Sequence, residues 1–140
     1  MCAALELNSR IIRPGKWIGV WRNSGRERVL WAGFARHEIL PWWQRKGGEL
    51  VDIPADRFDE RSDQTRALIW EQIPDGEVVR GLIDTTRGQA LLKVVTRPST
   101  DEELRHFQHP RMPLVEPPIF RADRFEVADE SPAQIQQELF

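Results

Sequence analysis

The sequence predicts a compact α+β domain that is mostly β, built on a barrel-like or mixed sheet with a few short helices. Runs rich in Val, Ile and Leu recur along the chain with turn residues between them, which is typical of strands. These runs are residues 16–22, 28–34, 50–54, 67–72, 77–83 and 90–97. Thr100 and Glu103 form a capping-box pattern, which predicts a short helix over residues 100–107.

Turn and loop residues separate these elements. Residues 23–25 (Asn-Ser-Gly) predict a hairpin between the first two strands, and residues 74–76 (Pro-Asp-Gly) predict a second turn. Residues 38–46 are ambiguous because they contain a proline. Four prolines between residues 110 and 118 predict irregular structure there. Residues 131–140 fit either a terminal helix or a loose tail.

Length and composition indicate one ordinary globular domain. The chain has 140 residues, of which 40% are hydrophobic and 30% charged. A single cysteine cannot form an internal disulfide, which favours a reducing compartment. Because the N-terminal region has no long apolar run, we expect no signal peptide and no membrane contact. The expectation is a cytoplasmic monomer without metal or cofactor.

The net charge of −2 hides an asymmetry along the chain. Residues 1–50 carry nine Lys and Arg against four Asp and Glu, a balance of +5, whereas residues 51–140 carry eleven against eighteen, a balance of −7. Five tryptophans are interleaved with the basic residues of the first part: Trp17, Trp21, Trp31, Trp42 and Trp43. Such a mixture suits a groove that follows phosphates and stacks bases. The alternative is a solvated face over a Trp-rich core.

The cysteine is residue 2, directly after the start methionine. If Met1 is removed, Cys2 carries both an α-amine and a thiol, and such groups are partly deprotonated near neutral pH. A 1,2-aminothiol condenses with an aldehyde to an imine, and its thiol then closes a stable five-membered thiazolidine ring. The alternative is an N-terminal residue without a role in a poorly ordered tail.

Three further segments complete a pattern with Met1-Cys2. They are residues 34–38 (FARHE, after Trp-Ala-Gly), residues 53–60 (IPADRFDE) and residues 109–113 (HPRMP, after Val95-Thr96). In this order they resemble the SOS response-associated peptidase (SRAP) family. That family opens Met-Cys and continues with a Trp-Gly segment, Asn-Ala-Arg-x-Glu, Pro-Ala-Asp-Gly-Phe-x-Glu-Trp and His-x-Arg-Met-Pro. The resemblance covers residues 1–117 and leaves residues 118–140 as a C-terminal extension.

The resemblance implies a function in DNA repair. SRAP proteins capture abasic sites in single-stranded DNA, because the N-terminal cysteine bonds to the aldehyde of the ring-opened sugar. Cys2 matches this nucleophile. Glu60 matches a carboxylate that moves the proton for sugar opening and orients the α-amine, and His109 matches a proton donor to the sugar oxygen. The alternatives are an exposed charge in an acidic loop for Glu60 and a helix-capping surface histidine for His109.

Five further residues match the DNA-binding side of the family. Arg36 and Arg111 match phosphate-contacting arginines, and Glu38 belongs to the same motif as Arg36. Trp31 matches an aromatic wedge beside the lesion, and Thr96 a strand-end threonine near the active site. The alternatives are salt bridges for the arginines, a core position for Trp31 and plain β propensity for Thr96.

Three positions depart from the family pattern. Phe34 replaces the asparagine of Asn-Ala-Arg, so an amide that would hydrogen-bond the sugar or the terminus is lost. Arg57 replaces a glycine, which suggests a backbone conformation that arginine adopts less readily, and Arg61 replaces a tryptophan. The chain fits a compact, divergent member of the family.

Other functions fit part of the same pattern. In an N-terminal nucleophile hydrolase, the α-amine would be the general base for the Cys2 thiol and an amide would be cleaved. In a non-catalytic binding module, Cys2 would be incidental and the Trp/Arg-rich half would bind nucleic acid or protein. Cys2, His106 and His109 offer three possible metal ligands, but their spacing matches no structural zinc pattern.

Overall fold

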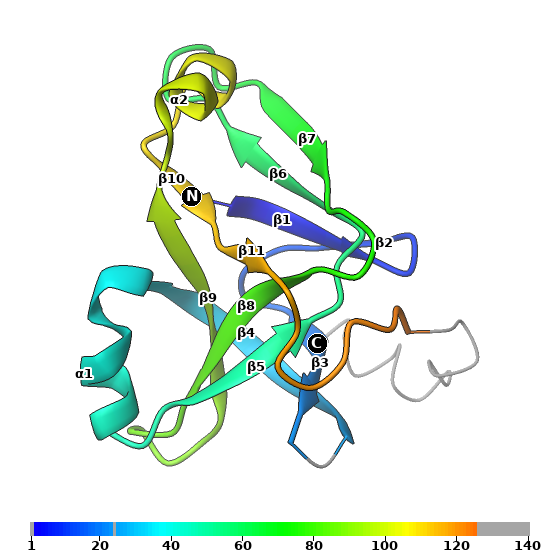
Figure 1. The fold of residues 1–140 in the computed structure, drawn as a ribbon, viewed down its shortest axis with the longest axis vertical. Coiled ribbons are helices and arrows are strands. Elements are labelled where there is room, and N and C mark those ends of the chain that lie inside the picture. The colour runs from blue at the N-terminus through cyan, green and yellow to red at the C-terminus, as the bar shows by residue number, and fades with distance from the viewer. Residues whose placement is uncertain (1, 24, 126–140) are drawn as a thin grey trace.

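The computed structural model describes residues 2–23 and 25–125, which form mostly β structure with two short α-helices (Figure 1). The strands are β1 (Cys2–Leu7), β2 (Arg10–Ile12), β3 (Trp17–Arg22), β4 (Gly25–Arg36), β5 (Glu49–Ile53), β6 (Arg57–Arg61), β7 (Leu68–Gln72), β8 (Val78–Asp84), β9 (Leu91–Pro98), β10 (Arg111–Pro113) and β11 (Val115–Glu116). The helices are η1 (His37–Ile39, 3-10), α1 (Leu40–Arg45) and α2 (Asp101–Phe107). Each strand and helix predicted from its own sequence pattern is present, with ends shifted by three residues or fewer.

The strands form two sheets. The larger sheet has the order β10-β9-β4-β3-β5-β8-β11, and a further pairing of β8 with β9 closes five of its strands into a ring. Its only parallel pair among the described strands is β4 with β9, so the sheet is mixed, as predicted. The smaller sheet is antiparallel, with the order β2-β1-β6-β7. It lies across one end of the larger sheet in Figure 1, near α2.

One hydrophobic core joins the two sheets. Leu5 of β1 and Phe58 of β6 belong to the same buried cluster as Ile18 of β3 and Leu92 of β9. Because residues of both sheets share this core, the position of the small sheet is set by packing against the larger one. The amino end of the described chain is therefore part of the folded body.

The proline-rich segment differs from the prediction of irregular structure. Residues 111–113 form β10 and residues 115–116 form β11, each at an edge of the larger sheet. Edge strands tolerate proline because only one side of the strand takes part in the hydrogen-bonded ladder. The ambiguous residues 38–46 form η1 and α1, with Pro41 in the first turn, where its missing N–H breaks no helical bond.

Three further strands carry no clear sequence signal, namely β1, β2 and β6. In β6 the only apolar side chain is Phe58, and its neighbours on both sides are charged. Arg57, at the position of the family glycine, begins β6 and is not among the described residues with positive φ, so the expected backbone restriction is wrong. The predicted terminal helix or tail at residues 131–140 lies outside the described residues.

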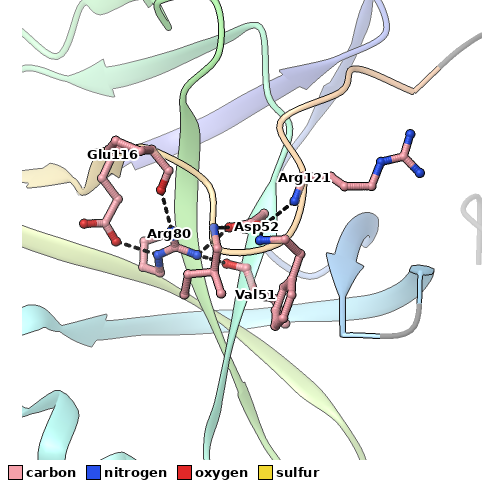
Figure 2. Close-up of polar contacts among 8 residues, drawn as sticks. Val51, Asp52, Arg80, Glu116 and Arg121 are labelled. Atoms are coloured by element: carbon pink, nitrogen blue, oxygen red, sulfur yellow. Dashed lines mark hydrogen bonds and ion pairs between the residues drawn. The ribbon is translucent and has the colours of Figure 1, made fainter.

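A buried arginine ties β8 to the end of the described chain. Arg80 is 1% exposed and its guanidinium donates to the Asp52 carboxylate (2.6 Å) and to the carbonyl oxygen of Val51 (2.8 Å) (Figure 2). It also donates to the Glu116 carboxylate (2.6 Å) and the Pro117 carbonyl oxygen (3.1 Å). A buried arginine is tolerated because each of these acceptors compensates for lost water.

The Asp52 carboxylate continues this network into the C-terminal segment. Its oxygens accept the backbone N–H groups of three consecutive residues, Ile119, Phe120 and Arg121, at 3.0, 2.6 and 2.9 Å. Burial opposes ionisation, but the Ile119 amide and the Arg80 guanidinium hold the pKa of Asp52 below its ordinary value. Farther along, Phe125 packs on Trp21 with ring centroids 4.8 Å apart. The first part of the C-terminal extension is thus attached to β3 and β5.

Replacing Asp52 by Ala should destabilise the protein by about 3–5 kcal/mol, because Arg80 would stay buried without its main counter-charge. Urea denaturation followed by circular dichroism measures this loss. Asp123→Ala is the matched control, since it removes only an exposed ion pair with Arg121 (2.5 Å) and should cost less than about 1 kcal/mol. Equal effects of the two substitutions would contradict a stabilising role for the buried network.

Candidate functional site

The pairing of β1 with β6 fixes the position of the amino end of the chain. In this antiparallel pair Cys2 lies opposite Glu60 and Leu5 opposite Phe58, with a register shift between residues 2 and 4. The pair is held by buried leucines of β1 and by an ion pair in which Arg57 donates to Glu6 (2.5 Å). On its other side, Leu5–Leu7 of β1 pair with β2. The Cys2 backbone is therefore placed beside a carboxylate.

Two consecutive acids of β6, Asp59 and Glu60, are both fully buried. Successive side chains of a strand point to opposite faces, so the two carboxylates face different surroundings. Asp59 lies 4.0 Å from the guanidinium of Arg13, whereas Glu60 lies on the side of His109. The alternative of an exposed Glu60 in an acidic loop is therefore wrong.

Burial changes the acid–base behaviour of Glu60. Loss of hydration is the largest cause that raises its pKa, and the negative charges of Asp59 and Asp63 raise it further, to about 7. A carboxyl group with this pKa is present in both protonated and ionised forms at neutral pH. Such a group can donate or accept a proton during a reaction.

His109 lies next to Glu60 and is mostly buried, with a side chain 13% exposed. Its Nδ1 is 3.9 Å from Glu60 Oε2, and its Nε2 is 3.9 Å from Asp63 Oδ1. The backbone N–H of Arg111 donates to Nδ1 at 3.0 Å. The Arg111 carbonyl oxygen also lies 2.9 Å from Nδ1, so both backbone polar groups of Arg111 hold this side of the ring, and Nε2 faces Asp63.

The end of α2 sets the position of His109. Gln108 takes the left-handed conformation (φ 55°) that ends α2, so this residue, not His109, occupies the cap position. Its side-chain oxygen accepts from Ser62 Oγ (2.5 Å), and its carbonyl oxygen accepts from the Asp63 N–H (3.0 Å). Ser99 Oγ donates to the His109 carbonyl oxygen (2.7 Å). These bonds tie the loop after β6 to the end of α2 and so bring the imidazole to Glu60.

Arg111 connects Glu60 and His109 to residues that the sequence analysis matched to DNA binding. Its guanidinium binds both oxygens of Glu38 (2.6 and 2.9 Å) and donates to the Thr96 carbonyl oxygen (2.8 Å). The hydrogen bond from Arg111 lowers the pKa of Glu38 to about 2. The salt-bridge alternative for Arg111 is thus observed. A phosphate reaching this guanidinium would have to replace the half-exposed Glu38 carboxylate.

Arg36 is close to the same group, but Trp31 is not. Arg36 is exposed and lies opposite Thr96 in the parallel pairing of β4 with β9. Trp31 is fully buried, its indole N–H donates to the Gly33 carbonyl oxygen (3.1 Å), and its ring meets Phe34 edge-on (5.9 Å). The core alternative for Trp31 is therefore observed, and its ring has no free face for a base.

Several residues that position the site were not predicted from the sequence. Ser62, Gln108 and Ser99 hold the loop and the histidine backbone, yet none belongs to a recognisable motif. Asp63 was visible only as one of several acids in its region. Within residues 2–23 and 25–125 no group of three or more His, Cys, Asp or Glu could hold a metal ion. In the same residues no helix is long and apolar enough to cross a membrane.

Comparison with family models, curated proteins and solved structures finds no match to this chain. The class that fold and site define is a small mixed-sheet domain with a buried acid–imidazole pair beside its amino end. The resemblance to the SRAP family stays a hypothesis based on the order of its four motifs.

The raised pKa of Glu60 makes stability pH-dependent. The unfolded side chain ionises near its ordinary value of 4.5, and the folded one near 7, so between these values the folded state binds more protons. Stability from this group is therefore present below pH 4.5 and is lost as the pH rises through 7, by on the order of 3 kcal/mol. Glu60→Gln removes the titration.

We therefore expect the unfolding free energy of Glu60→Gln, relative to the parent, to rise between pH 5 and pH 8. Urea titrations at both values measure it. Glu71→Gln, which alters an exposed acid of the neighbouring strand β7, should show no such pH dependence. A flat difference for Glu60→Gln would mean that Glu60 ionises as an ordinary exposed carboxylate.

Proposed function

We propose that this protein captures abasic sites in single-stranded DNA as a thiazolidine crosslink to Cys2. The observation that carries the proposal is the pairing of residue 2 with Glu60, a buried carboxylate with a pKa of about 7, itself 3.9 Å from an imidazole. An aminothiol nucleophile needs proton transfer at the carbon it attacks. Glu60 and His109 are acid–base groups suited to that transfer.

The proposed chemistry begins with removal of Met1, which frees the α-amine of Cys2. The amine attacks C1′ of the ring-opened sugar, and loss of one water gives an imine. The sulfur of the thiol then bonds to the same carbon, the electron pair of the C=N bond moves to nitrogen, and nitrogen takes a proton. Aldehyde and aminothiol thus give thiazolidine and water without an oxidant or reductant.

Glu60 and His109 would divide the proton transfers between them. An abasic sugar is mostly a closed hemiacetal, so its C1′ hydroxyl must lose a proton and its ring oxygen must gain one before the aldehyde appears. Ionised Glu60 would accept the first proton and orient the α-amine. His109, whose Nδ1 is held by the Arg111 backbone and whose Nε2 faces Asp63, would donate a proton to the sugar oxygen.

The residues around Arg111 would bind the DNA backbone. Arg111 and Arg36 lie on either side of Thr96 and present guanidinium groups suited to phosphate oxygens. Glu38 would be displaced from Arg111 when a phosphate binds. An N-terminal nucleophile hydrolase would use the same amine and carboxylate but would have no use for these arginines, so amide cleavage without DNA would favour that enzyme instead.

Cys2→Ala should abolish the crosslink to an abasic oligonucleotide that survives a denaturing gel. The variant keeps an α-amine and can form only the imine, which water reverses. Intact single-stranded DNA is the negative control, since it offers no aldehyde. If Cys2→Ala crosslinked as fast as the parent, another nucleophile would have to be responsible.

Glu60→Gln and His109→Ala should each slow crosslinking, by up to ~10²–10⁴-fold, because each removes one positioned proton-transfer group. Single-turnover rates at saturating DNA separate this effect from binding. Glu71→Gln and His106→Ala change an acid and an imidazole elsewhere on the surface and serve as controls. Rates unchanged from the parent in both site variants would remove the proposed acid–base roles.

A further inference from the structure

A second basic and aromatic cavity lies away from the proposed capture site. It has a volume of about 610 Å³ and opens beside α1, between the end of β8 and the start of β9. In Figure 1, α1 lies near the opposite end of the molecule from α2, which His109 follows in the chain, and from β6, which contains Glu60. The side chains relevant to binding are Trp42, Trp43, Lys46, Asp84, Arg87 and Lys93.

The charges of this cavity favour an anion. Lys46, Arg87 and Lys93 face a single carboxylate, that of Asp84. This carboxylate is engaged locally, because one of its oxygens accepts both the backbone N–H (2.9 Å) and the hydroxyl (2.7 Å) of Thr86. The cavity therefore has an excess of two positive charges. Phosphate groups are suited to such a site.

The aromatic rings add a second kind of contact. Trp42 is 45% exposed, although burying so large an apolar ring would be favourable. Trp43 meets it edge-on with centroids 4.9 Å apart, and the indole N–H of Trp43 has no hydrogen-bond partner in the described part of the chain. Lys46 lies 5.7 Å from the Trp42 ring and Lys93 lies 5.8 Å from the Trp43 ring. Stacking rings next to cations are the usual composition of a single-strand binding surface.

The position of α1 relates this cavity to the capture site. Arg36, opposite Thr96, is joined to Trp42 by η1 and the first turn of α1. These six residues span at most ~22 Å when extended. A single strand with a rise of about 3.4 Å per nucleotide covers that distance in about six nucleotides. One strand can therefore extend from Arg36 to Trp42.

We propose that this cavity is a second binding site for single-stranded DNA, which holds the strand within about six nucleotides of the phosphate that Arg36 binds. Trp42 stacks on a base, and Lys46, Arg87 and Lys93 bind the adjoining phosphates. The identity of the strand as lesion-bearing DNA rests on the proposed function, but the binding of a single strand does not.

The test measures reversible binding of intact oligonucleotides of about fifteen nucleotides to the Cys2→Ala protein by fluorescence anisotropy. Trp42→Ala should weaken binding by about five- to a hundredfold, the loss of one stacked base. Phe120→Ala is the control, because it removes an exposed ring outside this cavity. Trp42→Phe keeps a stacking face and should retain most of the affinity.

The charges are tested by the salt dependence. Lys46→Gln and Lys93→Gln should each reduce the slope of log affinity against log salt by about 0.7. Lys16→Gln, outside the cavity, is the matched charge control and should leave the slope nearly unchanged. Inorganic polyphosphate, which has phosphates but no bases, should bind Trp42→Ala as well as it binds the protein with Trp42 intact.

The outcomes separate the two proposals. Loss of intact-strand affinity in Trp42→Ala, with no crosslink to abasic DNA by the parent, would keep this site and remove the proposed capture chemistry. Crosslinking by the parent, with strand binding that is insensitive to Trp42, Lys46 and Lys93, would overturn the site alone. Absence of any single-strand binding, or equal losses for polyphosphate and DNA in Trp42→Ala, would also overturn it.

Discussion

The hydrogen-bonded pairing of β1 with β6 is the constraint on which the site depends. An N-terminal residue has one peptide neighbour and would ordinarily be mobile, but here β1 is the second strand of a four-stranded sheet and its leucines belong to the shared core. The register of this pair decides which residue of β6 lies beside the amino end. A slip by one residue would direct Glu60 to the other face of the sheet, so the hydrophobic pattern of β1 also specifies the polar site.

The protein buries acids in two different ways. Asp52 is surrounded by the Arg80 guanidinium and three backbone amides, so its pKa stays below the ordinary value and its role is structural. Glu60 lies in a site where burial outweighs the compensating charges, and its pKa rises to about 7. The first arrangement stabilises the fold, whereas the second weakens it at neutral pH and leaves a carboxyl group able to exchange protons. Groups whose pKa is shifted by burial are typical of functional sites.

The sequence predicted the strands with clear apolar patterns, the capping box of α2 and the mixed sheet. It did not predict β6, because four of its five residues are charged and the burial of Asp59 and Glu60 depends on the sheets that pack around them. For the same reason local pattern could not decide between an exposed and a buried Glu60. The order of the motifs identified five residues as candidates for one site, and the structure places them in one chain of contacts: Glu60, His109, Arg111, Thr96 and Glu38. Trp31 was also matched by its motif, but the structure places it in the core.

The central claim is that the amino end of this chain reacts as an aminothiol beside Glu60. Intact-mass spectrometry of the native protein, before and after incubation with an abasic oligonucleotide, tests it most directly. The account predicts a protein mass without Met1, and then an adduct equal to protein plus oligonucleotide less one water, which peptide mapping assigns to Cys2. A protein that keeps Met1 and forms no adduct, or an adduct on another residue, would contradict the account.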